Sequence, residues 1–451
     1  MQDFTKGSES RHIIKFAIPL MIGYVIQQLY SVVDSIIVGR FMENGEQGLA
    51  AIGAAFPVIF FLISLVVGIS NGGMVIISHF FGKKDYEGIH KAIETVNIFL
   101  FICAIIIGVI GISLAEPIFR AMQLPADVIP KAVTYMQIYS VGFLGMFGYH
   151  GVSAVLRGVG DSKTPLYVLI ISSILNIILD FVFIVGFKTG IAGVAWATVI
   201  SQTATFIGIV IYLNKNHPLI RYTFGLRFDM SIFKESVRIG LPSGFQQSFV
   251  GLGNMALMGI VSKFGTVSVA AYSVAGRIDM LCAVPAIALS MAFSTFVGQN
   301  LGAQKIQRIE RGYKYTIGIG VLLSVSLSLI ILVFREYIMG VFTNESELIP
   351  IGAQYLAIVS PFYILFTVLF ISNGALRGAG DTLIPMFVTL FALWVIRVPA
   401  SYYLSQHFGE VGIWWGIPAG WFVGMVFSTA YFLTGTWKKK TIHRKKIIVV
   451  E

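Results

Sequence analysis

The chain has 451 residues, of which 56% are hydrophobic and only 12% are charged, about half the charged fraction of a soluble domain. Together with a mean hydropathy of +0.82, this composition excludes a water-soluble globule. The net charge of +10 does not indicate a nucleic-acid partner, because basic residues beside anionic lipid explain the same excess.

Apolar runs of roughly 20 or more residues, long enough to cross a bilayer core about 30 Å thick, recur along the whole chain. They lack the short alternating segments of a membrane barrel, so we expect helices whose backbone groups bond internally. The predicted fold is all-α and polytopic, with twelve transmembrane helices. The predicted spans are 13–38, 49–78, 95–115, 132–155, 165–187, 190–213, 236–262, 267–298, 315–334, 349–375, 385–404 and 411–436.

An internal repeat organises these spans. Residues 156–165 (LRGVGDSKTP) recur at an offset of 220 as residues 376–385 (LRGAGDTLIP), with six of ten positions identical. We therefore predict two six-helix bundles, and because six crossings are even, the copies are parallel repeats of the kind found in some secondary transporters. The predicted domains are an N-terminal ion-coupling bundle, a cytoplasmic linker, a C-terminal bundle and a basic cytoplasmic tail: 1–213, 214–235, 236–437 and 438–451.

Basic residues predict the orientation. Counted together with Lys15 and Arg238 at the adjoining ends of spans 1 and 7, the N-terminus, the even-numbered loops and the C-terminus hold 24 of the 32 Lys and Arg, and the odd-numbered loops hold six. The positive-inside rule then places both termini in the cytoplasm of a multi-pass protein of the cell (inner) membrane. Cys103 and Cys282 lie within spans that the repeat does not relate, so neither a disulfide framework nor a metal set is expected from them.

Span 1 carries a proline and a carboxylate. Pro19 is expected to kink the helix, because it removes one backbone hydrogen bond. An intramembrane acid such as Asp34 is costly and is a functional candidate by default. The alternative is that Asp34 lies near the outer interface, where water solvates it.

Spans 5 and 6 add oxygen-bearing side chains. Asn176 and Asp180 are four residues apart and share one helix face, and Thr198 follows in span 6. These groups suit either a sodium ion or a protonated acid. At the 220-residue offset, the positions of Asp34, Asn176 and Asp180 read Asn254, Ile396 and Ala400. The acidic site was not duplicated, which favours ion binding in the N-terminal bundle.

The opening spans of the second half are rich in methionine and aromatic residues, which suit recognition of varied apolar molecules, although ordinary packing explains any single one. Arg277 and Asp279 are two residues apart and therefore lie on different faces of the helix. We expect them to pair with groups of other spans, and Arg397 is a candidate partner. Their role is either structural or in substrate binding or gating. The predicted substrate cavity comprises Gln27, Tyr30, Phe245, Gln246, Asn254, Met255, Met258, Tyr272, Met280, Arg277 and Asp279.

Taken together, these motifs resemble the multidrug and toxic compound extrusion (MATE) family. The likeness rests on Pro19 and Asp34, the two Leu-Arg-Gly-x-Gly-Asp turns, Asn176-x-x-x-Asp180, Thr198 and the sequence VGQNLG at 297–302. The resemblance implies a twelve-helix antiporter that exports amphipathic, often cationic compounds in exchange for protons or sodium.

Within that family, the acids of spans 1 and 5 are similar to those of the DinF-like branch. This likeness implies an ion site in the N-terminal bundle, formed by Asp34, Asn176, Asp180 and Thr198 with Tyr135 as a weaker addition, and a first span that bends at its proline. Sodium, if it is the coupling ion, would lie at Asp34, Asn176 and Asp180. The NorM-like pattern of acids in spans 7 and 10 is missing, so a C-terminal ion site is in doubt.

The predicted mechanism is alternating access of two bundles, driven by an ion gradient. No Gly-x-x-x-x-Gly-Lys-Ser/Thr loop and no His-Glu-x-x-His set occurs, so we expect neither an enzyme nor an organic cofactor. The expected partners are small amphipathic drug-like molecules and membrane lipid, and the expected state is a monomer. The alternative is a flippase for lipid-linked saccharides, although only Arg277 and Arg397 supply cations within spans for a diphosphate. The sequence alone does not exclude a passive channel.

Overall fold

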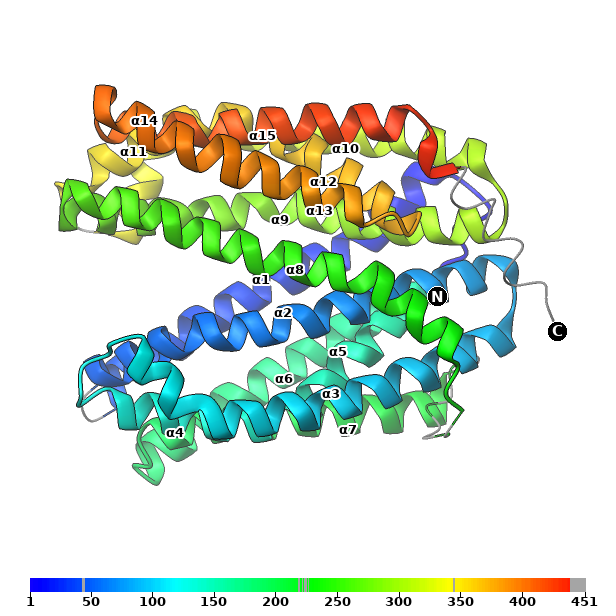
Figure 1. Ribbon diagram of the computed structural model, residues 1–451, viewed down its shortest axis with the longest axis horizontal. Coiled ribbons are helices and arrows are strands. Elements are labelled where there is room, and N and C mark those ends of the chain that lie inside the picture. Colours follow the sequence, from blue (N-terminus) through cyan, green and yellow to red (C-terminus); the bar gives the residue numbers. More distant parts are fainter. Residues whose placement is uncertain are drawn as a thin grey trace. The chain divides into compact units, whose positions relative to one another are not determined.

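The structure is a computed structural model that describes residues 1–42, 45–217, 220, 222, 225, 227–343 and 345–438. In this part of the chain every regular element is a helix, as the apolar runs predict (Figure 1). The basic tail predicted at 438–451 lies outside the described residues except for Lys438, and so do residues 218, 219, 221, 223, 224 and 226 of the predicted linker at 214–235.

The chain divides into two compact units. Unit 1 comprises Met1–Gln2 and Ile22–Gly244, and unit 2 comprises Asp3–Met21 and Phe245–Glu451. These divisions fall inside two long helices, α1 (Glu9–Phe41) and α8 (Met230–Val261), and not in loops. The predicted bundles at 1–213 and 236–437 therefore differ from the units, because hydropathy marks where a helix ends but not which half of it packs on which neighbours.

Unit 1 contains the second half of α1, the first half of α8 and the helices between them. Its buried aliphatic core joins α2, α3, α5 and α7, and a second cluster extends over α1, α2, α3, α4 and α7. The intervening helices are α2 (Gly45–Lys83), α3 (Tyr86–Ala121), α4 (Ile129–Val141), α5 (Phe143–Gly158), α6 (Lys163–Phe181), the π-helix η1 (Val182–Gly186) and α7 (Ile191–Asn216).

Unit 2 is built in the same way around a core from α8, α9, α10, α11, α12 and α15. Span 11 contains a π-helical segment, as does its counterpart span 5. The elements after α8 are the short 3-10 helix η2 (Ser262–Phe264), α9 (Thr266–Gly302), α10 (Ile306–Phe342), α11 (Leu348–Val359), the 3-10 helix η3 (Ser360–Phe362), α12 (Tyr363–Gly378), α13 (Leu383–Leu390), the π-helix η4 (Phe391–Arg397), α14 (Val398–Phe408) and α15 (Glu410–Leu433).

Ten helical segments of the described chain are long and apolar enough to cross a membrane. The other two predicted spans are α8 and the pair α4–α5. Gly142 separates α4 from α5 and lies so close to α7 that a Cβ there would come within 2.5 Å of the Val199 side chain. The fourth predicted span is thus two shorter helices, and the all-α polytopic fold is as predicted.

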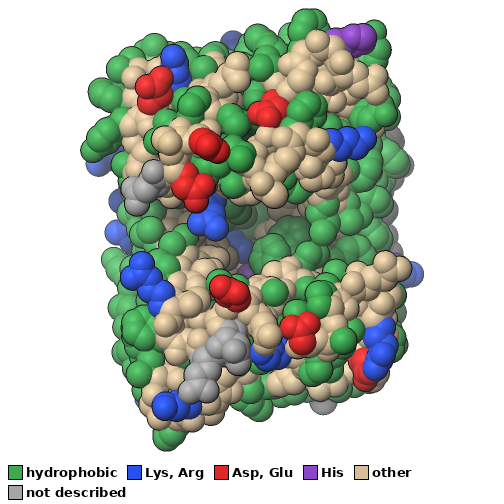
Figure 2. All heavy atoms as spheres, turned by 90° about the vertical axis from the view of Figure 1, so that its left-hand side faces the viewer, with side chains coloured by type: hydrophobic (Ala, Val, Ile, Leu, Met, Phe, Trp, Pro, Cys, Tyr) green, Lys and Arg blue, Asp and Glu red, His purple; other side chains and the backbone are tan. Residues whose placement is uncertain are grey.

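The surface matches a lipid environment. On α10, Leu322, Leu329 and Val333 share one face and are 68%, 58% and 72% exposed, an apolar stripe that water would not favour. In the view of Figure 2, charged side chains gather on the end that faces the viewer, and the flanks of each unit are mainly hydrophobic. Exposed apolar flanks are what helices in contact with acyl chains require.

The repeated Leu-Arg-Gly-x-Gly-Asp sequence forms a corner in each unit. Gly160 and Gly380 have φ of +82° and +75°, the left-handed backbone that glycine adopts without strain. In the first copy, the Asp161 amide donates to the Leu156 carbonyl at 2.8 Å, and Asp161 Oδ1 accepts from the Thr164 amide at 3.1 Å. In the first copy the turn thus ends α5, and its aspartate accepts backbone hydrogen bonds from the first turn of α6, which is a structural role.

The sequence VGQNLG at 297–302 also has a structural use within unit 2. The Phe4 amide donates to Gln299 Oε1 at 3.0 Å, and Asn300 Nδ2 donates to the Phe4 carbonyl at 3.2 Å. The Phe4 ring is fully buried against Phe16 and Phe296, with ring centroids 5.3 and 5.9 Å away. The end of α9 therefore holds the segment that precedes α1.

Candidate functional site

Two carboxyl groups meet inside unit 1. Asp34 on α1 and Asp180 near the end of α6 lie within hydrogen-bonding reach of each other, although they are far apart in sequence. The Oδ1 atoms of both side chains are buried and have no hydrogen-bond partner among the described residues. The structure therefore brings together the two acids that were predicted to share one ion site.

Neutral oxygen and nitrogen groups complete this carboxyl pair. In the amide orientation that satisfies its neighbours, Asn176 donates to Asp180 Oδ2 at 2.9 Å and accepts from the Thr198 amide at 3.2 Å. The Thr198 hydroxyl donates to the Val194 carbonyl at 3.2 Å, within its own helix. Asn176 and Thr198 thus fix the orientation of Asp180 from two adjacent helices, α6 and α7.

Three tyrosines surround the pair. Tyr30 lies within hydrogen-bonding reach of Thr198 and near Asp34, Tyr135 lies near both acids, and Tyr139 lies near Asp34. The ring centroids of Tyr135 and Tyr139 are 5.8 Å apart. Tyr30 was predicted to line the substrate cavity, but it is one helical turn before Asp34 and faces the same way. Tyr139, one turn after Tyr135, was missed, although that spacing was visible in the sequence.

This arrangement determines what the site can bind. Two carboxylates in contact inside a low-dielectric interior repel each other, so at least one proton or one cation must be shared between them. The neutral oxygens of Asn176 and Thr198 beside them are also the hard ligands that sodium accepts. The site is chemically suited to a reversible exchange of one monovalent ion.

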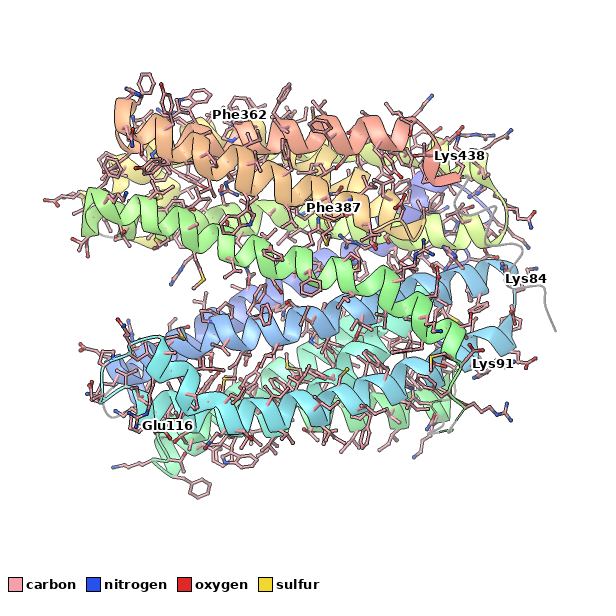
Figure 3. The ribbon with its side chains drawn as sticks, viewed as in Figure 1. Lys84, Lys91, Glu116, Phe362, Phe387 and Lys438 are labelled. Carbon is pink, nitrogen blue, oxygen red and sulfur yellow. The ribbon has the colours of Figure 1, made fainter. Side chains whose placement is uncertain are left out.

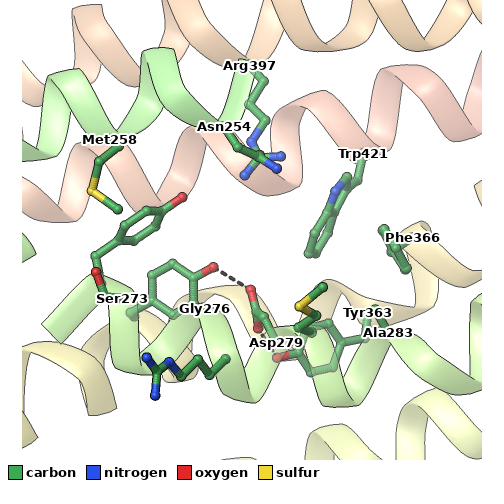
Figure 4. A pocket seen from close by; sticks show the side chains of 14 residues that line it. Asn254, Met258, Ser273, Gly276, Asp279, Ala283, Tyr363, Phe366, Arg397 and Trp421 are labelled. Atoms are coloured by element: carbon green, nitrogen blue, oxygen red, sulfur yellow. Dashed lines mark hydrogen bonds between the residues drawn. The ribbon is translucent and has the colours of Figure 1, made fainter. Parts of the chain in front are cut away.

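Unit 2 contains a cavity of about 520 Å³, within the range of sites for drug-sized ligands (Figure 4). Six predicted residues line it: Asn254, Met258, Tyr272, Arg277, Asp279 and Met280. Eight lining residues were not part of the predicted cavity: Ser273, Gly276, Ala283, Tyr355, Tyr363, Phe366, Arg397 and Trp421. Aromatic residues occur throughout this chain, so the sequence held no signal that selected these particular rings.

The remaining predicted cavity residues lie elsewhere. Gln246 donates to Thr389 Oγ1 at 2.6 Å and so packs on α13, and Phe245 lies beside Phe249. Gln27 and Met255 are exposed. Only one stripe of α8, that of Asn254 and Met258, reaches the cavity, because residues four apart share a helix face and adjacent residues do not.

Asp279 is the half-buried acid of this cavity. The hydroxyls of Tyr355 and Tyr363 donate to its two carboxylate oxygens, Oδ2 and Oδ1 respectively. No ion pair joins Asp279 to Arg397 in the described part of the chain, so the pairing suggested from the sequence is not what the structure forms. Figure 4 shows Asp279 and Arg397 entering from different walls of the cavity.

The fold and these two sites define a class: a multi-pass membrane protein made of two repeated helical units, one with a buried carboxyl pair and one with a ligand-sized cavity. The family model MatE matches residues 19–182 and again 242–403, one stretch in each copy of the repeat. The chain belongs to the MatE family. The family assignment made from the motifs is confirmed.

Relatives cover nearly the full chain. The chain is 33% identical to the "Probable multidrug resistance protein YoeA" of Bacillus subtilis (strain 168), over 98% of this chain and 97% of that protein. It is 31% identical to the "Probable multidrug resistance protein YpnP" of the same organism, over 98% and 99%. Among solved structures, "MATE in the bent conformation" matches with a TM-score of 0.90 at 25% identity, covering 97% of this chain and 98% of that one.

Proposed function

We propose that the protein is a secondary active multidrug efflux antiporter, which exports amphipathic compounds in exchange for protons or sodium. The observation that carries this proposal is the buried contact between Asp34 and Asp180. A carboxyl pair that must hold a proton or a cation can exchange ions. The names of two relatives of the chain refer to multidrug resistance. One charge that moves across 100 mV contributes about 2.3 kcal/mol, which can drive export.

The coupling acts through α1 in this proposal. Asp34 lies on the half of α1 that belongs to unit 1, and the half before Ile22 belongs to unit 2. Pro19, three residues before Ile22, interrupts the helical hydrogen bonds and is the proposed hinge. Binding or release of an ion at Asp34 changes the charge on one half of the helix, and α1 transmits the change as the two bundles alternate access.

Transport in vesicles tests the proposal. Purified protein in liposomes is expected to move ethidium uphill when either a pH or a sodium gradient is imposed alone, and the effective gradient identifies the ion. Asp34→Asn and Asp180→Asn each remove one carboxylate from the pair, so gradient-driven transport is expected to fall at least about 10-fold, the equivalent of about 1.4 kcal/mol of coupling.

Asp127→Asn is the matched control, because Asp127 is exposed and accepts a hydrogen bond only from Gln47 among the described residues. It is expected to transport as the unmodified protein does. Undiminished uphill transport by the Asp34 and Asp180 variants would show that the carboxyl pair is not the coupling site. Downhill movement alone, in every protein, would identify a channel.

A further inference from the structure

The cavity of unit 2 has an unequal charge balance. Only three of its lining residues carry charge: Arg277, Asp279 and Arg397. The single carboxylate is already occupied, because both of its oxygens accept tyrosine hydroxyls. Two arginines therefore line a cavity whose one acid already accepts hydrogen bonds from within the protein.

Neither arginine is in direct contact with a carboxylate of the described residues, although Asp279 lies close enough to Arg397 for electrostatic attraction. In the described part of the chain, no ion pair involves Arg277 or Arg397. Arg397 lies within hydrogen-bonding reach of the neutral Tyr272 hydroxyl, but its Nε is buried and has no hydrogen-bond partner among the residues that the structure describes. A buried guanidinium nitrogen without an acceptor is costly, and a ligand carboxylate or similar anion would supply that acceptor.

The other walls suit a flat apolar body. Trp421 packs against Phe366 and Tyr363 with ring centroids 5.2 and 6.2 Å apart, and Tyr272 and Tyr355 both pack against the buried Trp414. These contacts hold the rings in place, so the aromatic surfaces are preorganised. Preorganised aromatic walls bind planar rings without a large loss of side-chain entropy.

We propose that this cavity binds an amphipathic aromatic carboxylate, with the carboxylate on Arg397 and Arg277 and the ring system between the aromatic walls. The proposal that such carboxylates are transported rests on the proposed efflux function and extends its substrates from cationic to anionic compounds. The proposal that the cavity binds them does not depend on transport. Arginine is suited to this role, because its planar fork matches a carboxylate in two parallel hydrogen bonds.

Calorimetric titration of the full-length protein in detergent tests the site. The probes are 2-naphthoate and its neutral isostere 2-naphthamide, with 2-naphthylmethylammonium as the cation of similar shape. We expect 2-naphthoate to bind about 10-fold more tightly than the amide, as a charge-assisted hydrogen bond predicts, and the ammonium to bind most weakly. Equal affinities, or a preference for the ammonium, would overturn the proposal.

Substitutions of the two arginines test whether they cause the preference for naphthoate over the amide. Arg397→Gln is expected to abolish the preference for naphthoate, and Arg397→Lys to keep part of it, because lysine retains the charge and loses the planar fork. Arg277→Gln, at an exposed position, is expected to reduce the preference even if Arg397→Gln fails to fold. Arg335→Gln removes the same charge outside the cavity and should change nothing. Unchanged preference in the Arg277 and Arg397 variants would refute the assignment.

Two further measurements distinguish a soluble carboxylate from an anionic lipid, and binding from transport. In nanodiscs, affinity for naphthoate should be the same with phosphatidylcholine and with phosphatidylglycerol; loss of binding in phosphatidylglycerol would make an anionic lipid the occupant and overturn the proposal. Asp34→Asn should bind naphthoate normally while it loses gradient-driven transport. Naphthoate binding without any uphill transport would reject the antiporter but not the carboxylate site. Uphill transport without naphthoate binding would reject only the carboxylate site.

Discussion

At the level of single residues, the repeat places different chemistry at equivalent positions. Asp34 belongs to the carboxyl pair of unit 1, and its counterpart Asn254 lines the cavity of unit 2. Tyr135 lies beside the carboxyl pair, and its counterpart Tyr355 donates to Asp279. Equivalent positions of the two copies thus have different surroundings: in unit 1 they lie at the carboxyl pair, and in unit 2 they line the cavity.

The Tyr30 hydroxyl is expected to contribute to ion binding. Tyr30→Phe removes one hydroxyl next to Asp34 and Thr198, and a single hydrogen bond is worth about 0.5–1.5 kcal/mol, so gradient-driven efflux should fall about 2- to 10-fold. Tyr167→Phe, at a tyrosine that is 59% exposed on α6, is the matched control and should transport normally. Equal rates of dye efflux in both variants would exclude Tyr30 from the site.

The sequence revealed only part of this site. Asn176 and Asp180 could be placed on one face because they lie one turn apart on the same helix. Contact between Asp34 and Asp180 depends on how α1 packs against α6, which periodicity does not contain. For the same reason the sequence did not predict that Tyr30 lies near Asp34 and Thr198, or that Arg397 lines one cavity with Tyr272 and Asn254.

At the level of elements, glycines set how closely α2 and α8 pack. A Cβ on Gly68 would come within 2.4 Å of the Gly244 backbone nitrogen, and one on Gly240 within 2.4 Å of the Ile69 Cα. These partners are backbone atoms that cannot rotate away. The two helices are therefore in contact at their main chains, the arrangement that small residues permit in membranes.

Substitution at this contact is expected to destabilise the protein. Gly68→Ala would force α2 and α8 apart, and overpacking of this kind typically costs about 1–3 kcal/mol. Gly208→Ala on α7 is the control, because nothing lies within 4 Å of the added Cβ and alanine favours a helix. Thermal unfolding in detergent should show a lower midpoint for Gly68→Ala alone. A midpoint equal to that of the control would mean that the contact relaxes freely.

Helix boundaries were predicted less well than helix number. Hydropathy predicted the fourth span but not its division into α4 and α5, because Gly142 within a long apolar run cannot be distinguished from a glycine that only permits close packing. The π-helical segments η1 and η4 have no sequence signal of their own. The division of α1 and α8 between units was equally invisible, since each is one uninterrupted helical sequence with an internal proline, Pro19 or Pro242.

At the level of the whole molecule, the distribution of charge predicts the orientation in the membrane. In unit 1, Lys84 and Lys91 lie at one end and Glu116 toward the other (Figure 3). The loop with the two lysines belongs to the predicted cytoplasmic side, which holds 24 of the 32 basic residues. The positive-inside rule therefore predicts that this end faces the cytoplasm.

Cysteine labelling tests this orientation. In a background with Cys103→Ala and Cys282→Ala, the substitutions Lys91→Cys and Glu116→Cys each remove one partner of an exposed ion pair, with Glu87 at 2.9 Å and Arg120 at 2.6 Å. Exposed pairs of this kind contribute only about 0–1 kcal/mol, so both variants should fold. A membrane-impermeant maleimide added to intact cells should label the cysteine at 116 and not the one at 91, and permeabilised cells should label both. The reverse pattern would place the basic end outside, against the charge rule.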